Sequence, residues 1–177
     1  MKTGGFTLKV ELTSGTSVTS ASLTPTIITA ESGKTITTSG KLDTGGVIDL
    51  AWAANSSVAC FPATENLNFN GNHNVYRAAL PKNSEMTVTV EPLDPTLDVS
   101  LYAYTVSSTD TTSIPPNVKS AVACEAGYDQ SHDHNPGSSE SVKLIAINNP
   151  YNVFIGVAGA GATKTGSYKL KVQLAPR

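Results

Sequence analysis

The chain has 177 residues, of which 39% are hydrophobic and only 15% charged, and its formal net charge is -2. This length suits one domain with a sizeable core, and the scarcity of charged residues favours strands over surface helices. There is no basic run and no stretch near the roughly 20 apolar residues of a transmembrane helix. The sequence therefore excludes nucleic acid as a partner and predicts no membrane insertion.

The first residues carry a strand signal and lead into a region rich in Ser and Thr. Apolar side chains alternate with polar ones at Phe6, Leu8, Val10 and Leu12. A period of two is typical of a strand with one buried face. We expect a strand over residues 1–12 and a linker over residues 13–26. Residues 1–5 lack the apolar core of a signal peptide, so an exported form would already have lost its signal.

Further strand signals follow to the end of the chain, separated by Gly, Pro and Asn turns. The β-formers Ile27, Ile28 and Ile36 begin the series. Alternating segments then lie at residues 48–52, 86–90, 97–103, 153–157 and 168–174. No window shows the apolar spacing of a capped helix. The pattern predicts an all-β fold over residues 27–177, an antiparallel, jelly-roll-like sandwich with little or no helix.

The two cysteines, Cys60 and Cys124, are far apart in the sequence and neither belongs to a metal-binding spacing. A disulfide between them is the favoured interpretation, and two buried free thiols are the alternative. Charge-poor chains rich in Thr and Ser are typical of oxidising, extracellular settings. We therefore expect a secreted, extracellular or cell-surface protein.

The strongest internal signal is a repeat. Residues 2–12 align without gaps on residues 164–174, and seven of the eleven positions are identical. The identities include the polar Lys-Thr-Gly that precedes each strand, which makes a chance match between two amphipathic strands the weaker explanation. Residues 2–12 are therefore predicted to be a surplus copy of the last strand, either donated to another subunit through Phe6, Leu8, Val10 and Leu12 or left from a preceding domain.

Three further runs resemble one family. They are Asp94-Pro95-Thr96-Leu97-Asp98-Val99-Ser100-Leu101-Tyr102, then Val153-Phe154-Ile155-Gly156-Val157 after Asn149-Pro150-Tyr151, and finally Thr165-Gly166-Ser167-Tyr168-Lys169-Leu170-Lys171-Val172. Together they resemble a bacterial pre-peptidase C-terminal domain over about residues 35–174. The resemblance implies a jelly-roll-like sandwich of an exported protein. The collagen and Ca²⁺ binding of some members is not carried over, because only Glu31 and Asp43 stand where those members have an acidic cluster.

Two groups of residues are candidate sites. Asp129, His132, Asp133 and His134 offer ligands suited to Zn²⁺, although a solvated polar loop is the alternative. Asp94 and Asp98 would suit Ca²⁺, but an aspartate before a strand more often caps a turn. No cofactor is required by the sequence.

The second candidate site is a face on which Asp98, Ser100, Tyr102 and Tyr104 lie together, opposite Leu101. With Trp52, Tyr128 and Tyr151 it would form an aromatic surface for a partner such as a sugar, and packing in the core is the alternative.

Catalytic motifs such as G-x-S-x-G and H-E-x-x-H do not occur, and the acidic residues are scattered. We therefore expect a non-enzyme. The first hypothesis is an extracellular structural or adhesive module that forms a homopolymer, as a fibre or array, by donating its N-terminal strand. The alternatives are an ancillary domain beside neighbouring domains of a larger secreted enzyme, and a carbohydrate- or metal-binding module.

Overall fold

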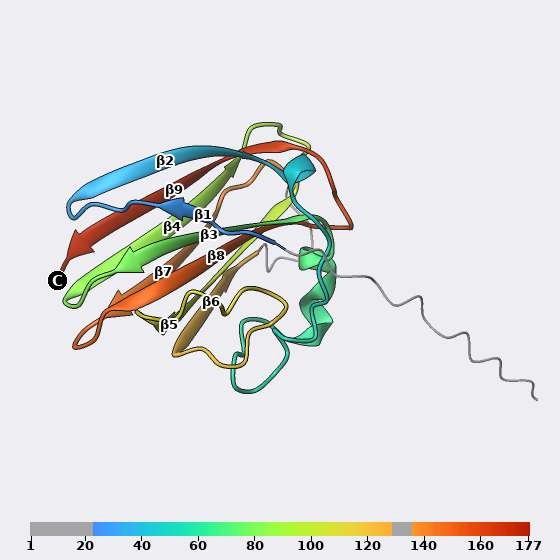
Figure 1. Cartoon of the computed structure of the whole chain (residues 1–177). Helices are drawn as coiled ribbons and strands as arrows, with labels where there is room; N and C mark the ends of the chain where they lie inside the picture. The colour runs from blue at the N-terminus through green and yellow to red at the C-terminus, as the bar shows by residue number, and fades with distance from the viewer. Residues whose placement is uncertain (1–22, 129–135) are drawn as a thin grey trace, which may run out of the picture.

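The computed structural model describes residues 23–128 and 136–177, and these residues form a sandwich of two β-sheets (Figure 1). The nine strands are β1 (Thr26–Ile28), β2 (Lys34–Lys41), β3 (His73–Leu80), β4 (Ser84–Pro92), β5 (Val99–Ser107), β6 (Ala123–Gly127), β7 (Glu140–Ala146), β8 (Tyr151–Gly159) and β9 (Ser167–Pro176). One sheet has the order β1-β3-β8-β5-β6 and the other β2-β9-β4-β7. The predicted all-β sandwich is confirmed.

Helical structure in the described residues consists of two 3-10 segments, η1 (Leu42–Thr44) and η2 (Ala63–Phe69). No described helix has the length and apolar character needed to cross a membrane. Every strand pair is antiparallel except β1 and β3, which run parallel over three residues.

The main core lies between the two sheets and follows directly from the period-two patterns. Strands β4 and β9 pair along nearly their whole lengths, with Val88 beside Val172. Seven of their apolar side chains point inward and are buried: Met86, Val88, Val90, Tyr168, Leu170, Val172 and Leu174. Polar residues between them face outward, so the strands predicted at residues 86–90 and 168–174 are confirmed.

A second core lies on the outer face of the five-stranded sheet. The segment of residues 46–72, which includes η2, covers Tyr102, Tyr104 and Phe154 there. Its own buried apolar residues include Ile48, Leu50, Trp52, Phe61 and Phe69. The five-stranded sheet is thus covered on both faces, by the other sheet and by this segment.

The strand predicted at residues 48–52 is wrong. Residues 48–50 belong to no strand, and turns follow from Ala51, in which the Ala53 amide donates to the Leu50 carbonyl and the Asn55 amide donates to the Trp52 carbonyl. Ile48, Leu50 and Trp52 do face the second core. The alternation of apolar residues here comes from an irregular segment that packs one side against the five-stranded sheet. Periodicity alone does not distinguish such a segment from a strand.

Strand β3 was not predicted, because both of its faces are buried. Tyr76, Ala78 and Leu80 enter the main core, whereas His73 and Val75 face the second core. A strand covered on both sides loses the alternation that marks a half-buried strand. Strands β6 and β7 were also missed.

The two lateral edges of the sandwich differ. On one side β6 and β7 contact each other across the sheets, and a Cβ on Gly127 would lie only 3.2 Å from the Ser141 backbone. On the other side β1, the edge strand of one sheet, spans only three residues, whereas β2, the edge strand of the other sheet, spans eight (Figure 1). The second edge is therefore the more open of the two.

Candidate functional site

A groove of about 770 Å³ lies at the open edge, and we name it the β1/β2 groove. It is bounded by the end of β2, by the chain that enters β1 and by the start of β3. Its lining is Leu23, Thr24, Thr26, Thr38, Ser39, Gly40, Lys41, Thr44, Asn74, Val75, Tyr76, Leu93 and Ser167. Most of these side chains are uncharged, and the polar ones are mainly hydroxyls. The groove therefore suits a neutral chain segment or ligand with both polar and apolar groups.

The groove is closed at the bottom by a hydrogen-bonded group that joins the two sheets. The hydroxyls of Tyr76 on β3 and Tyr168 on β9 lie 2.8 Å apart. The side-chain amide of Asn74 donates to the Tyr168 hydroxyl at 2.8 Å and to the Lys41 carbonyl at 2.6 Å. Burial raises the pKa of both tyrosines, so both hydroxyls stay neutral.

Gly40 allows β2 to approach this group. A Cβ at Gly40 would collide with the ring of Tyr168 and with the hydroxyl of Tyr76. Tyr168 is the register partner of Gly40 on β9, and its ring fills the space that a larger residue would occupy. The sequence Thr38-Ser39-Gly40 thus fixes the end of the groove.

The inner face of β2 is only half covered. Ile36, Thr38 and Gly40 are partly exposed, whereas their partners on β9, Val172, Leu170 and Tyr168, are fully buried. Among the described residues β2 pairs with β9 alone. The six residues of β2 between Lys34 and Lys41 carry no charge. Charged side chains in the middle of a strand are a common defence against added strands, and β2 lacks them.

The residue just before β9, Gly166, is a glycine that the fold requires. Gly166 has φ +134, and a Cβ there would lie 2.6 Å from a methyl group of Leu97. Its carbonyl accepts a hydrogen bond from the Leu42 amide at 2.9 Å. In the repeat Gly4 is the counterpart of Gly166. Phe6, Leu8, Val10 and Leu12 lie outside the described residues, so their role in strand exchange stays a prediction.

The predicted partner face around Tyr102 is wrong for most of its residues. Tyr102 and Tyr104 are fully buried and Ser100 is 2% exposed. The tyrosines do lie opposite Leu101, as expected, but the segment of residues 46–72 covers them. The ring of Trp52 lies 5.3 Å from that of Tyr102 and 5.6 Å from that of Tyr104. This aromatic set therefore belongs to a core, the alternative that the sequence left open.

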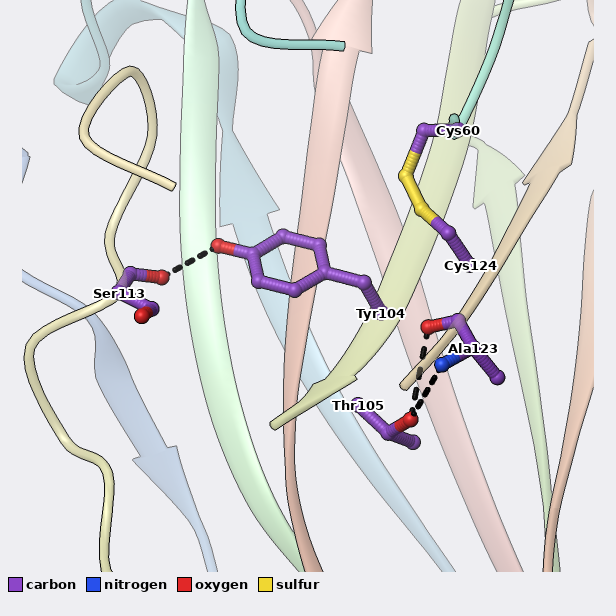
Figure 2. The surroundings of a disulfide bond; sticks show 6 residues. All are labelled: Cys60, Tyr104, Thr105, Ser113, Ala123 and Cys124. Atoms are coloured by element: carbon purple, nitrogen blue, oxygen red, sulfur yellow. Dashed lines mark hydrogen bonds between the residues drawn. A yellow bond between two sulfur atoms is a disulfide. The ribbon is translucent and has the colours of Figure 1, made fainter. Parts of the chain in front are cut away.

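The predicted disulfide between Cys60 and Cys124 is confirmed, with Cα atoms 4.9 Å apart. It ties residues 46–72, which we call the covering segment, to β6, the edge strand of the five-stranded sheet (Figure 2). Figure 2 shows that Tyr104 points away from the disulfide toward Ser113, whose carbonyl accepts its hydroxyl at 2.6 Å. The covering segment and the 108–122 loop are thus both anchored to the five-stranded sheet.

The imidazole of His73 is buried beside the second core. Its Nδ1 lies 3.2 Å from the Gly71 carbonyl, and its ring packs 5.8 Å from that of Tyr102. Burial lowers the pKa of His73 to about 4. The imidazole is therefore neutral at physiological pH, with Nδ1 as the donor.

Asp94 and Asp98, the two residues considered as Ca²⁺ ligands, have structural roles. Asp94 caps a turn, since its carboxylate accepts from the Thr96 amide at 2.8 Å and from the Thr96 hydroxyl at 2.7 Å. These hydrogen bonds lower the pKa of Asp94. Asp98 lies one residue before β5, and its carbonyl accepts from the Ala160 amide.

The predicted metal ligands Asp129, His132, Asp133 and His134 lie outside the described residues. Within residues 23–128 and 136–177, no three His, Cys, Asp or Glu residues gather in a way that would hold a metal ion.

Comparisons with known proteins give structural matches only. No family model and no curated protein sequence matches the chain. The pre-peptidase C-terminal domain of a collagenase from Bacillus anthracis is 10% identical, with a TM-score of 0.39 over 87% of this chain and 97% of that chain. CorA, a surface-associated copper-binding protein of Methylomicrobium album BG8, is 12% identical, with a TM-score of 0.46 over 88% and 98%.

A third match is PliG of Aeromonas hydrophila, a periplasmic inhibitor of g-type lysozyme. It is 10% identical, with a TM-score of 0.38 over 85% of this chain and 99% of that chain. At these identities the likeness concerns the fold alone. A pre-peptidase C-terminal domain, the family that the sequence resembles, is thus among the matched structures.

Proposed function

We propose that this chain is an extracellular, non-catalytic structural module whose copies associate when residues 2–12 of one copy add a strand to another. The observation that carries the proposal is the correspondence between residues 2–12 and β9. Phe6, Leu8, Val10 and Leu12 align with Tyr168, Leu170, Val172 and Leu174, which are the buried residues of β9. A segment with this pattern has four apolar side chains to bury against a sheet.

The Lys-Thr-Gly sequence that precedes the apolar alternation in both copies of the repeat supports the same proposal. Gly166 stands at a backbone angle that only glycine adopts without strain, next to Leu97. A chance amphipathic repeat has no reason to place glycine at the equivalent position, Gly4. Residues 2–12 therefore carry the sequence requirements of a complete strand together with its entry turn.

The setting and the absence of catalysis are supported by the chemistry of the described residues. The disulfide of Cys60 and Cys124 requires an oxidising compartment to persist. The lining of the β1/β2 groove includes no Asp, Glu, His or Cys among the described residues, the side chains that most often act as general bases or metal ligands, and its Tyr76 hydroxyl stays neutral. An exported binding or structural role is the function that fits these features.

A matched pair of variants tests the proposal on the full chain. Leu8→Lys with Val10→Lys places charges on the apolar face of residues 2–12, whereas Thr7→Lys with Glu11→Lys changes the polar face. Light scattering after size-exclusion chromatography is expected to give oligomers for the unaltered chain and the polar-face variant, and monomers for the apolar-face variant. Equal masses for all three proteins would contradict the proposal.

A further inference from the structure

We infer that the acceptor for this strand is the outer edge of β2, with the β1/β2 groove receiving residues 2–12 of a second copy. The inference rests on the proposed function and names the surface it uses. Two other acceptors are available in principle: the position that β9 itself occupies, and the opposite edge of the sandwich. The contacts of Tyr168 and of Gly127 argue against them.

Replacement of β9 by residues 2–12 would leave polar groups unpaired. Tyr168 gives Tyr76 and Asn74 a hydrogen-bond partner at the bottom of the groove. Phe6 stands at the matching position of the repeat and has no hydroxyl. A buried donor or acceptor left without a partner costs roughly 1–3 kcal/mol. Residues 2–12 would therefore be less stable than the original strand in the position of β9.

The opposite edge of the sandwich is closed by its own strands. Gly127 on β6 lies so near Ser141 on β7 that a side chain there would press on the backbone. β7 also carries Lys143 on its exposed face, in an ion pair with Glu85 at 2.9 Å. β6 and β7 contact each other along that edge, and the inward-facing Val142 and Leu144 of β7 are already buried.

The edge of β2 offers the features that an added strand needs. The strand has eight residues, its central six are uncharged, and its inner face is half exposed at Ile36, Thr38 and Gly40. In the register that β9 uses, Leu8 would stand beside Thr38. Its side chain would enter the β1/β2 groove, whose apolar walls include Val75 and Leu93.

The alternation of residues 2–12 fits a strand at this edge. With Phe6, Leu8 and Val10 turned toward the groove, the polar Thr7, Lys9 and Glu11 would face solvent. Leu93 is 53% exposed in the structure, and such a strand would cover it. The added strand would thus close the open edge of the sandwich in the way that β6 and β7 close the other.

Cysteine cross-linking in the full chain tests the inference. The variant Leu8→Cys with Thr38→Cys places thiols on the two residues expected to be neighbours. Two controls are Thr7→Cys with Thr38→Cys, on the polar face, and Leu8→Cys with Ser141→Cys, at the closed edge. Mild oxidation, non-reducing electrophoresis and peptide mapping identify each new disulfide, with the bond of Cys60 and Cys124 as internal reference.

The first variant is expected to cross-link between chains about 10-fold faster than either control, because pairing raises the local thiol concentration. Equal rates in all three would overturn the inference, even where light scattering shows oligomers, since the strand would then bind elsewhere. A fast bond within one chain would confirm the groove as acceptor and contradict association between copies.

Hydrogen exchange gives a second readout that needs no cysteine. Amides of β2 are expected to exchange more slowly in the unaltered chain than in the variant Leu8→Lys with Val10→Lys. Amides of β7 serve as the control and should be the same in both. Unchanged exchange along β2 would overturn the inference.

Discussion

The hydroxyl of Tyr168 on β9 lies 2.8 Å from the hydroxyl of Tyr76 on β3, so a hydrogen bond joins the two sheets at the bottom of the β1/β2 groove. Tyr168 is fully buried, and Asn74 donates to the same oxygen. The Tyr168 hydroxyl therefore joins β9 to β3, and Asn74 in turn holds the end of β2 through the Lys41 carbonyl. The repeat has phenylalanine at this place, so the original strand and its copy are not interchangeable.

The variant Tyr168→Phe is expected to lower the free energy of unfolding by roughly 1–2 kcal/mol, because Asn74 and Tyr76 each lose a partner. Tyr102→Phe is the matched control, since the buried Tyr102 hydroxyl has no hydrogen-bond partner among the described residues. Its removal should leave stability unchanged or raise it. Urea unfolding followed by tryptophan fluorescence measures both, and an equal loss in the two variants would contradict this account of the groove.

Loss of the disulfide is expected to weaken the attachment of the covering segment. Cys60 and Cys124 are 64 residues apart, and closing a loop of that length stabilises by about 4 kcal/mol in the chain-entropy model. The variant Cys60→Ser with Cys124→Ser should lose a comparable free energy of unfolding. Trp52 lies in the covering segment, so its fluorescence should change before the main core unfolds. A variant as stable as the unaltered chain would show that packing alone holds the segment.

Acid is expected to destabilise the protein through His73. The pKa of this imidazole is about 4 in the folded state, against an ordinary value of 6.5, because burial disfavours the charged form. The unfolded chain therefore binds the proton more readily. The stability is fully present above pH 6.5 and is lost as the pH falls toward 4, by about 3 kcal/mol in total.

Urea unfolding at a series of pH values measures this loss. His73→Gln keeps a donor for the Gly71 carbonyl and does not titrate, so the difference between the two proteins isolates His73. Identical slopes between pH 6.5 and 4 would contradict the assignment of the acid sensitivity to His73.

The glycine before β9 should not tolerate a side chain. Gly166→Ala would put a side chain on a residue whose φ is +134 and would press its methyl group against Leu97. Backbone strain and the clash together are expected to lower the free energy of unfolding by roughly 2–4 kcal/mol. Gly33→Ala is the control, because Gly33 also has a positive φ, +76, but has no atom within 4 Å of the added Cβ. Its cost should be about 1 kcal/mol. Thermal unfolding compares the two, and equal losses would remove the argument that Gly4 matches a required position.

Periodicity predicted the strands that have one face in the core and one in solvent. In β4 and β9 the buried Val88 and Val172 alternate with polar residues that are partly or fully exposed, and the sequence pattern is sufficient. The same pattern failed for Tyr102, because the polar neighbours of Leu101 are covered by residues 46–72. A second covering layer is a tertiary feature, and alternation along one strand carries no information on it.

The candidate site was predictable only in part. The even count of cysteines and their wide spacing led to the disulfide, and the repeat identified residues 2–12. The β1/β2 groove depends on how short β1 is and on how closely Gly40 approaches Tyr168. Residues 73–80 gave no strand signal, so the position of Tyr76 was not available from the sequence.

The central claim is association between copies, and the molar mass of the unaltered chain in solution tests it most directly. Sedimentation equilibrium over a range of protein concentrations is expected to give weight-average masses above 18.4 kDa that rise with concentration. A constant mass of 18.4 kDa at every concentration would contradict the account.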